Sequence, residues 1–326
     1  MQVSHAQGQS AYLVSTPHAN NEMELETTDA SQNNASLITI ANNAIQCDEA
    51  IKTEINGLQT SAVTAQQVLI DDSLRKAIFA NVGRQQPPRY YLPKIKKAIY
   101  AETEPGLDCT RFLSHFNNMR KCFDAIVRFE HNGVKPNLVG GPFAKKLLVL
   151  DLDETLVHTF ENNPPSGCVK LTIMLYGKHA KDIYVKLRPF VREFLALASE
   201  MYDVVVFTAS HSTYSNPIID LLDPAGSIFK ARYYSDHCTK VDKYLVKDLR
   251  VLGRDLRHIV IVDNTVLCFG LQMANGVPIL CYKGQDVDTE LYELLHFLAF
   301  LSGLDDVRQG VMGYFRWDHF GKHYRD

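Results

Sequence analysis

The sequence lacks the features that mark secreted, membrane-spanning or thiol-chelating proteins. Its seven cysteines are scattered without a CxxC pair, and such an odd, unpatterned set is typical of reduced thiols inside a cell. The N-terminus has no basic patch followed by an apolar run, so we expect no secretory signal. No apolar stretch approaches the ~20 residues that cross a bilayer. We therefore expect no membrane span and an intracellular protein, nuclear or cytoplasmic.

Positive charge is almost absent from the first part of the chain. Lys52 is the only Lys or Arg before residue 73, whereas residues 73–146 are rich in both. A net charge of −3 over 326 residues argues against a generic nucleic-acid binder, so we expect no direct contact with nucleic acid. An acidic tail before a basic segment is typical of a regulatory or docking region. A solvated tail without a fixed role is the alternative.

Composition divides the chain into four parts. Residues 1–72, rich in Asn, Gln, Ser and Thr, are predicted to form a disordered tail. Residues 73–140 are predicted to be a helical, basic extension. Residues 141–310 carry the pattern of a folded domain, and residues 311–326 are predicted to be a C-terminal tail.

The basic extension contains two predicted helices and a proline-punctuated segment between them. A short helix is expected over 73–82, stopped by Gly83, and an amphipathic helix between 108 and 133. The segment 84–97 gathers three lysines among three prolines. It is either a docking or import patch or a connector whose charges face water.

From Lys145 onward, apolar runs alternate with helical patterns. Strands that end in acids or a small hydroxyl residue are predicted within 145–156, 201–210 and 258–265, with a further strand at 277–284, and the predicted helices begin at Pro189, Thr213 and Asp288. This alternation predicts an α/β fold with a doubly wound parallel sheet. The segment 168–189 alternates apolar and polar residues instead, which predicts a small β-hairpin inserted after the first strand, in the place of a cap domain.

Polar residues follow three of the predicted strands. They are Asp151 and Asp153 after the first, Thr208 after the second and Asp263 with Asn264 after the third. Ligands of open α/β sheets bind outside the carboxyl ends of the strands. Acids, a hydroxyl, an amide and the nearby Lys247 form a set suited to phosphoryl transfer, in which Mg2+ and Lys offset the charge of the phosphate.

The sequence DLDETLVHT at 151–159 resembles the DxDx[T/V] motif of the haloacid dehalogenase superfamily. It is most similar to the branch of RNA polymerase II C-terminal-domain phosphatases, which includes the small CTD phosphatases, Dullard-like and NLI-interacting-factor-like phosphatases. The resemblance continues through LRPFVREFLALASEMYDVVVFTAS, RYYSDHC, YLVKDLRVLGRDL, IVIVDN and the DTELYELL helix. It spans about 145 to 308, and it implies a haloacid dehalogenase-like fold for the domain at 141–310.

The resemblance also implies a role for each matched residue. Asp151 is then the nucleophile that forms an aspartyl-phosphate, and Asp153 the acid and later the base. Thr208 and Lys247 bind phosphate oxygens, with Ser210 and Tyr214 beside the substrate. The implied Mg2+ ligands are Asp151, the backbone carbonyl of Asp153 and Asn264, with Asp263 nearby.

Two positions depart from the family pattern. Ser235 stands where the small CTD phosphatases carry Arg, which removes a cation that would grip a second phosphate or an acidic flank. Thr265-Val266 stands where Ser-Pro is usual, so the hydroxyl is kept but the loop need not follow the same course. The first departure weakens the expectation that the polymerase tail is the substrate.

Other interpretations fit the pattern less well. An EF-hand needs further oxygen ligands and a Gly where Leu156 and Val157 stand, and a response-regulator receiver places its acidic pair before the phosphorylated Asp. His158, His237 and His258 belong to no spaced metal set, so we expect them to be structural.

The sequence therefore predicts a Mg2+-dependent protein serine/threonine phosphatase, acting on the polymerase tail or on another phosphoprotein. Without a cap the site stays open, which suits a phosphorylated protein segment. The alternatives are a small-metabolite phosphatase of the same superfamily and a phosphoprotein-binding scaffold.

Overall fold

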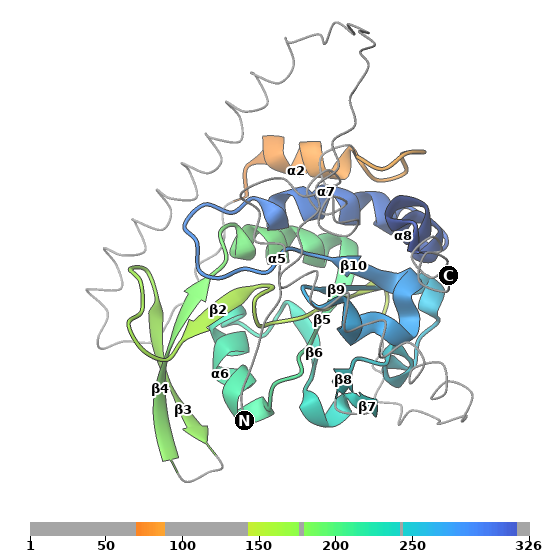
Figure 1. Ribbon diagram of the computed structural model, residues 1–326. Helices are drawn as coiled ribbons and strands as arrows, with labels where there is room; N and C mark the ends of the chain where they lie inside the picture. The colour runs from red at the N-terminus through yellow and green to blue at the C-terminus, as the bar shows by residue number, and fades with distance from the viewer. Residues whose placement is uncertain (1–69, 89–142, 176–178, 242–243, 318–326) are drawn as a thin grey trace, which may run out of the picture. The chain divides into compact units, whose positions relative to one another are not determined.

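A parallel sheet runs through the part of the chain that the computed structural model describes, namely residues 70–88, 143–175, 179–241 and 244–317. Its strand order is β10-β9-β1-β5-β6 (Figure 1), and all four pairings are parallel. The strands are β1 (Lys146–Leu150), β5 (Tyr202–Phe207), β6 (Phe229–Tyr233), β9 (Ile259–Asp263) and β10 (Gly276–Pro278).

Strand β1 lies at the centre of this sheet because its side chains are almost all apolar. Leu147, Leu148, Val149 and Leu150 are completely buried, as expected of a parallel strand that is covered on both faces. From β1 the chain moves to β5 and β6 on one side and then returns to β9 and β10 on the other. This reversal makes the carboxyl end of β1 the topological switch point, where open α/β sheets bind their ligands.

Helices cover both faces of the sheet, which confirms the predicted doubly wound α/β fold. They are α5 (Val191–Met201), α6 (Ser212–Leu222) and α7 (Glu290–Ser302), close to the three predicted spans. Figure 1 shows α5 and α7 together on one face and α6 on the other. Helix α6 begins where it does because the His211 side chain accepts a hydrogen bond from the Thr213 backbone N–H, which satisfies an otherwise unpaired first-turn donor.

The last predicted strand, 277–284, is wrong beyond Pro278. After β10 the Ile279 N–H still donates to the Asp263 carbonyl of β9 (3.2 Å), but the Tyr282 N–H donates to the Glu154 carbonyl (2.7 Å). The chain therefore leaves the sheet after Ile279 and contacts the loop that follows β1, because the Tyr282 N–H finds its partner there.

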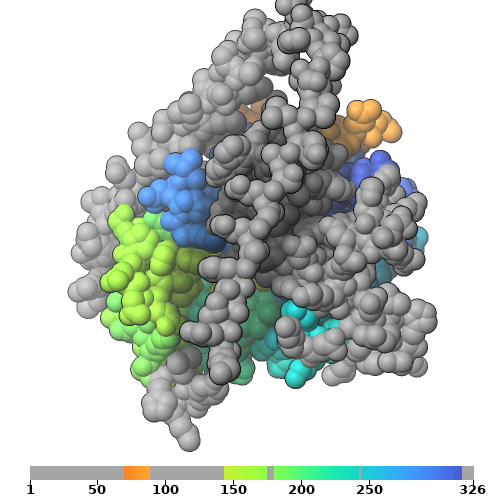
Figure 2. All heavy atoms as spheres, viewed as in Figure 1, coloured from red at the N-terminus to blue at the C-terminus, as the bar shows by residue number. Residues whose placement is uncertain are grey.

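The predicted hairpin after β1 is confirmed, and a third strand joins it. Strands β3 (Val169–Leu175) and β4 (His179–Leu187) pair antiparallel, and β2 (Val157–Phe160) pairs with the other edge of β4. Figure 2 shows this inserted sheet in yellow-green beside the blue segment between β10 and α7. An ion pair of 2.7 Å between Lys186 and Asp286 joins the two.

Strand β2 escaped prediction because three of its four residues belong to the DLDETLVHT motif, whose acids dominated the interpretation. Its neighbours in sequence are site residues, and its partner β4 follows about 25 residues later. Pairing at that distance depends on the fold as a whole, whereas the hairpin of β3 and β4 is local.

A two-stranded antiparallel ribbon leads the chain to Lys247. It consists of β7 (Thr239–Val241) and β8 (Tyr244–Val246). Three 3-10 helices follow in this half of the molecule: η3 (Leu249–Leu252), η4 (Leu256–His258) and η5 (Val266–Asn275), and a fourth, η2 (Ser235–His237), precedes the ribbon.

Helix α2 (Asp72–Phe79) confirms the short helix predicted over 73–82. Asp71 caps it by accepting from the Ser73 N–H at 2.6 Å. The helix packs on α7, where the Asn81 amide nitrogen lies 2.9 Å from Nδ1 of His296. The predicted helix at 108–133, most of the basic segment 84–97 and nearly all of the predicted tail 1–72 lie outside the described residues.

Helix α8 (Val307–Phe315) was not predicted and crosses the boundary drawn at residue 310. Val307, Val311, Tyr314 and Phe315 are buried at helical spacing, and Trp317 donates its ring N–H to the Gly276 carbonyl (3.3 Å). The apolar face of α8 and Trp317 therefore pack in the core, and residues 311–317 are not part of a tail. Among the described residues, no helix combines the length and apolar character needed to cross a membrane.

Candidate active site

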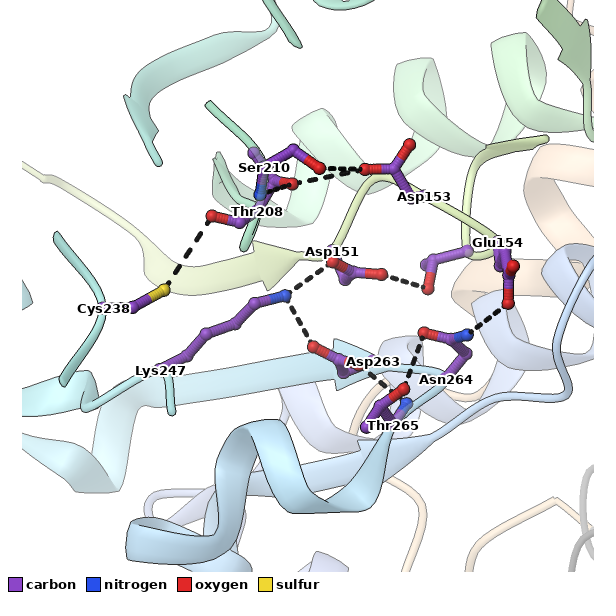
Figure 3. Close-up of polar contacts among 11 residues, drawn as sticks. Asp151, Asp153, Glu154, Thr208, Ser210, Cys238, Lys247, Asp263, Asn264 and Thr265 are labelled. Carbon is purple, nitrogen blue, oxygen red and sulfur yellow. Dashed lines mark hydrogen bonds and ion pairs between the residues drawn. The ribbon is translucent and has the colours of Figure 1, made fainter. Parts of the chain in front are cut away.

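The register of the central sheet brings the predicted site residues to one edge. Leu150 lies opposite Val206 on one neighbouring strand and Val262 on the other. The next residues along the three strands are therefore level, and the Asp151 N–H donates to the Val262 carbonyl at 3.0 Å. Figure 3 shows the polar side chains converging at these strand ends. The sheet thus assembles Asp151, Thr208 and Asp263 from segments more than fifty residues apart.

Lys247 lies between two of these carboxylates. Its Nζ donates to Oδ1 of Asp151 and to Oδ2 of Asp263, each at 2.6 Å. Its side chain is completely buried. Burial opposes the ammonium charge, but Asp151 and Asp263 outweigh it and raise the pKa of Lys247. Lys247 is therefore a fixed positive charge at the switch point.

Asp263 depends on Lys247 for its own ionisation. Burial and the nearby Asp151 raise the pKa of Asp263, while Lys247 and the Thr265 N–H act against that rise. The Thr265 N–H donates to Oδ1 of Asp263 at 2.7 Å, so both carboxylate oxygens have partners.

Asp151 is held by a residue that the sequence analysis did not assign to the site. The Thr155 hydroxyl donates to Oδ2 of Asp151 at 2.9 Å, and Thr155 is completely buried. Arg188 in turn donates to the Thr155 carbonyl at 3.0 Å while pairing with Asp288 at 2.8 Å. The signal for Thr155 was present, because it is the fifth residue of the motif that begins at Asp151.

Asp153 faces a group of hydroxyls. Its Oδ1 accepts from the Tyr214 hydroxyl at 2.6 Å, and its Oδ2 accepts from Ser210 at 2.8 Å and from Thr208 at 3.5 Å. Burial raises the pKa of Asp153, and the hydrogen bonds from Tyr214 and Ser210 act against it. Ser210 and Tyr214, predicted beside the substrate, thus have their hydroxyls on a predicted catalytic acid.

Asn264 meets Glu154, which the sequence analysis also left unassigned. The Asn264 amide nitrogen donates to Oε2 of Glu154 at 3.3 Å, and the Thr265 hydroxyl lies 3.5 Å from Oδ1 of Asn264. The Cys281 thiol donates to the same Glu154 oxygen at 2.7 Å. No local pattern links Glu154 to Asn264, because the two residues are 110 positions apart.

The donors at this edge fit Mg2+ by their chemistry. Asp151 and Asn264 offer carboxylate and amide oxygens on adjacent strands, and the Asp153 backbone adds a carbonyl, all hard oxygen donors of the kind that Mg2+ takes. Within the described ranges no group of three His, Cys, Asp or Glu side chains could hold a metal. The candidate set is not of that kind, since it combines two side-chain types with a backbone oxygen.

The two departures from the family pattern lie at the rim of the site. The Ser235 N–H donates to the Ser210 carbonyl at 3.0 Å, so residue 235 is adjacent to a hydroxyl that contacts Asp153. The next residue, Asp236, has a side chain that is 76% exposed, which makes this part of the rim acidic. Thr265 precedes η5, and its N–H holds Asp263.

The predicted structural histidines have partners other than the site residues. His158 packs edge-on against Phe160, with ring centroids 4.7 Å apart. Nδ1 of His237 accepts from the Tyr234 N–H at 3.1 Å. His258 ends the 3-10 helix η4.

The fold and the converging acids, hydroxyls and lysine define an α/β protein of the haloacid dehalogenase class. The model of the NLI interacting factor-like phosphatase family matches residues 146–308, half of the chain. The chain belongs to that family.

Relatives with similar sequences carry phosphatase names. "CTD small phosphatase-like protein 2" of Dictyostelium discoideum is 41% identical over 170 residues, 52% of this chain and 30% of the relative. The human "Carboxy-terminal domain RNA polymerase II polypeptide A small phosphatase 1" is 39% identical over 163 residues, 50% of this chain and 62% of the relative. "CTD nuclear envelope phosphatase 1B" of Danio rerio is 38% identical over 174 residues, 50% of this chain and 70% of the relative.

A solved structure, "The Structure of Fcp1, an essential RNA polymerase II CTD phosphatase", aligns with 56% of this chain and 49% of its own chain. The TM-score is 0.38 at 16% identity. Of the first curated relatives, this chain spans between 30% and 62% of the length.

Proposed function

We propose that the protein is a Mg2+-dependent phosphatase that removes phosphate from phosphoserine or phosphothreonine in other proteins, through an aspartyl-phosphate on Asp151. The observation that carries the proposal is Lys247 Nζ, held 2.6 Å from both Asp151 and Asp263 at the end of the central strand. Family membership over residues 146–308 supports the same class of activity.

Asp151 is the proposed nucleophile. One of its oxygens accepts from Thr155 and the other from Lys247, so the carboxylate is fixed in direction. An Asp151 oxygen attacks phosphorus, an aspartyl-phosphate forms, and the bond from phosphorus to the Ser or Thr oxygen breaks.

Asp153 is the proposed acid and base. Burial raises its pKa, which favours the protonated form that the first step needs. It gives its proton to the leaving Ser or Thr oxygen, and then takes a proton from the water that attacks the aspartyl-phosphate. That second step releases inorganic phosphate and restores Asp151. Tyr214 and Ser210 keep the carboxyl pointed at the reacting atoms.

Lys247 and Thr208 are the proposed ligands of the phosphate oxygens. The raised pKa of Lys247 keeps its charge in place near neutral pH, so it offsets the negative charge of the phosphate without reorganisation. Asp151, the Asp153 carbonyl and Asn264 would hold Mg2+, with Asp263 beside them. When bound, Mg2+ supplies charge neutralisation that lets an anion approach an anionic phosphate ester.

A protein substrate is favoured by the architecture next to the site. Between β1 and β5 the described chain contains only the inserted sheet and α5, so the strand ends carry no folded cap domain there. The acidic rim at Asp236 does not favour a substrate with acidic residues beside its phosphorylated residue. We therefore propose, in preference to the polymerase tail, a phosphoprotein whose sequence around the phosphorylated residue is less acidic. Cys168, Cys238, Cys268 and Cys281, the cysteines within the described ranges, form no disulfide there, in keeping with the proposed nuclear or cytoplasmic location.

Phosphopeptide-array hydrolysis by the purified full-length protein tests this function. With Mg2+ we expect release of phosphate from phosphoserine and phosphothreonine peptides, and from para-nitrophenyl phosphate, with loss of all three in EDTA. Asp151→Asn protein is the matched blank. Turnover of small metabolites without turnover of any peptide would overturn the protein substrate, and full activity in EDTA would overturn the metal assignment.

A further inference from the structure

The residue next to the acidic pair, Glu154, has an unusual backbone. Its φ is 64°, in the left-handed region that non-glycine residues seldom adopt because Cβ then comes close to the following carbonyl oxygen. Two backbone bonds hold it there: its N–H donates to the Val157 carbonyl and its carbonyl accepts from the Tyr282 N–H, both at 2.7 Å. The loop after β1 is thus pinned at Glu154 from two sides.

This backbone places the Glu154 side chain beside the end of β9. Figure 3 shows its carboxylate facing the Asn264 amide, across from Lys247 and Asp263. Oε2 of Glu154 accepts from the Asn264 nitrogen at 3.3 Å and from the Cys281 thiol at 2.7 Å. Glu154 therefore contacts a proposed metal ligand while lying outside the proposed ligand set.

The contact decides which end of the Asn264 amide faces the metal position. An Asn amide carries an oxygen that binds cations and a nitrogen that repels them, and its last torsion allows either end to point forward. An ionised carboxylate is an acceptor only. Glu154 therefore selects the amide nitrogen, which turns Oδ1 of Asn264 away from it, toward the Thr265 hydroxyl 3.5 Å away.

We propose that Glu154 is a positioning residue that orients Asn264 for binding Mg2+. This inference rests on the proposed function, because it takes Asn264 as a metal ligand. A free flip of the amide would by itself halve the competent population, about a twofold loss of affinity. Loss of a partner that orders a metal ligand typically costs about 10–100-fold, and we expect Glu154→Ala to raise the Kd for Mg2+ within that range.

Calorimetric titration of the full-length protein with Mg2+ alone tests the proposal, with Mn2+ titration followed by electron paramagnetic resonance as a second readout. Glu154→Gln can still offer an oxygen to the two donors, but its amide is no longer an acceptor only, so we expect its affinity for Mg2+ to lie between those of the wild-type protein and Glu154→Ala. Glu161→Ala is the matched control for loss of one acidic charge: Glu161 is 65% exposed and pairs with Lys181 at 2.6 Å in the inserted sheet.

A double-mutant cycle separates positioning from long-range charge. In an Asn264→Ala background, Glu154→Ala should have no further effect on the Kd for Mg2+. An equal loss in both backgrounds, or an equal loss in Glu154→Gln and Glu154→Ala, would overturn the proposal in favour of a simple charge effect. Thermal unfolding in EDTA identifies any variant whose loss of Mg2+ affinity reflects misfolding. If Glu154→Ala is misfolded, the affinity of Glu154→Gln for Mg2+ is the measurement that tests the proposal.

The outcomes also separate this inference from the proposed function. If the wild-type protein binds Mg2+ and Glu154→Ala binds it equally well, only the positioning role is overturned. If the wild-type protein binds no Mg2+ and hydrolyses phosphopeptides in EDTA, the proposed metal site is overturned, and the inference with it.

Discussion

The Tyr214 hydroxyl lies 2.6 Å from Oδ1 of Asp153 and also contacts the Thr159 hydroxyl at 2.9 Å. Tyr214 belongs to α6, Asp153 to the loop that follows β1, and Thr159 to β2. A helix and a strand of the inserted sheet therefore meet at the proposed acid. Burial and the Asp153 charge raise the pKa of Tyr214, which keeps its proton available for donation. Tyr214, which we predict to lie beside the substrate, therefore contacts the carboxyl group that is proposed to protonate the leaving group.

Tyr214→Phe should slow the enzyme most with substrates whose leaving group must be protonated. A hydrogen bond to a charged group is worth roughly 1.5–3 kcal/mol, so we expect kcat for a phosphoserine peptide to fall about tenfold or more. Para-nitrophenolate leaves without protonation, so the effect on para-nitrophenyl phosphate should be several times smaller. Tyr234→Phe is the control, because its hydroxyl contacts Asn216 at 2.6 Å and not Asp153. Equal losses with both substrates would contradict the prediction.

The two aspartates of the motif should fail differently. Asp151→Asn should abolish turnover of every substrate, because an amide does not attack phosphorus at a useful rate. Asp153→Asn keeps the nucleophile and loses the acid and base, typically worth about 10²–10⁴-fold. With para-nitrophenyl phosphate its second step should limit turnover, and phosphate should accumulate on Asp151. Mass spectrometry after an acid quench reads out the adduct; trapped phosphate on another residue would show that Asp151 is not the nucleophile.

Lys247 should be as important for stability as for chemistry. Lys247→Met leaves two buried carboxylates facing each other, and breaking a buried ion pair costs about 3–5 kcal/mol. We expect a loss of this size in urea unfolding measured in EDTA, with partial recovery when Asp263→Asn removes one of the charges. Lys240→Met, on the exposed part of β7, is the control. Unchanged stability of Lys247→Met would mean that the carboxylates are not ionised together.

The contact between α2 and α7 should make stability depend on pH. Burial, with a contribution from Arg84, lowers the pKa of His296 to about 4 from 6.5, and Nδ1 of His296 faces the Asn81 amide nitrogen. The unfolded chain therefore takes up the proton first. Stability from this residue is complete above pH 6.5 and is lost as the pH falls toward 4, by up to about 3 kcal/mol.

Urea unfolding at several pH values between 7 and 4.5 tests this dependence. The wild-type protein should lose stability more steeply than His296→Gln, in which residue 296 has no proton to gain. Parallel pH profiles for the two proteins would show that His296 does not carry the effect.

Much of the architecture was predictable because its determinants are local. Apolar runs such as 146–150 and 259–263 predicted parallel strands, and the polar residue after each run predicted the edge where the site lies. The alternation within 168–189 likewise predicted the hairpin of β3 and β4. These features depend on side chains within one strand or helix, and the order of the motifs along the chain was enough to indicate the family.

The same reasoning failed where partners are remote in sequence. The stretch 277–284 is apolar enough for a strand, yet only its first residues pair with β9, because the Glu154 carbonyl offers the Tyr282 N–H another partner. Most of helix α8 lies beyond the motifs that carry the family resemblance. Its apolar residues are spaced for a buried helix, but that the helix packs on the domain is seen only in the structure, where Trp317 donates to the Gly276 carbonyl.

Local patterns along the chain account for the parallel sheet, the inserted hairpin and the types of residue at the strand ends. The folded arrangement adds what no local pattern contains: Lys247 bridges Asp151 and Asp263, Tyr214 faces Asp153, and Glu154 faces Asn264. The difference is one of range, because the apolar pattern of a strand acts over a few residues. A hydrogen bond between side chains 61 or 110 positions apart forms only after the sheet has brought their backbones together.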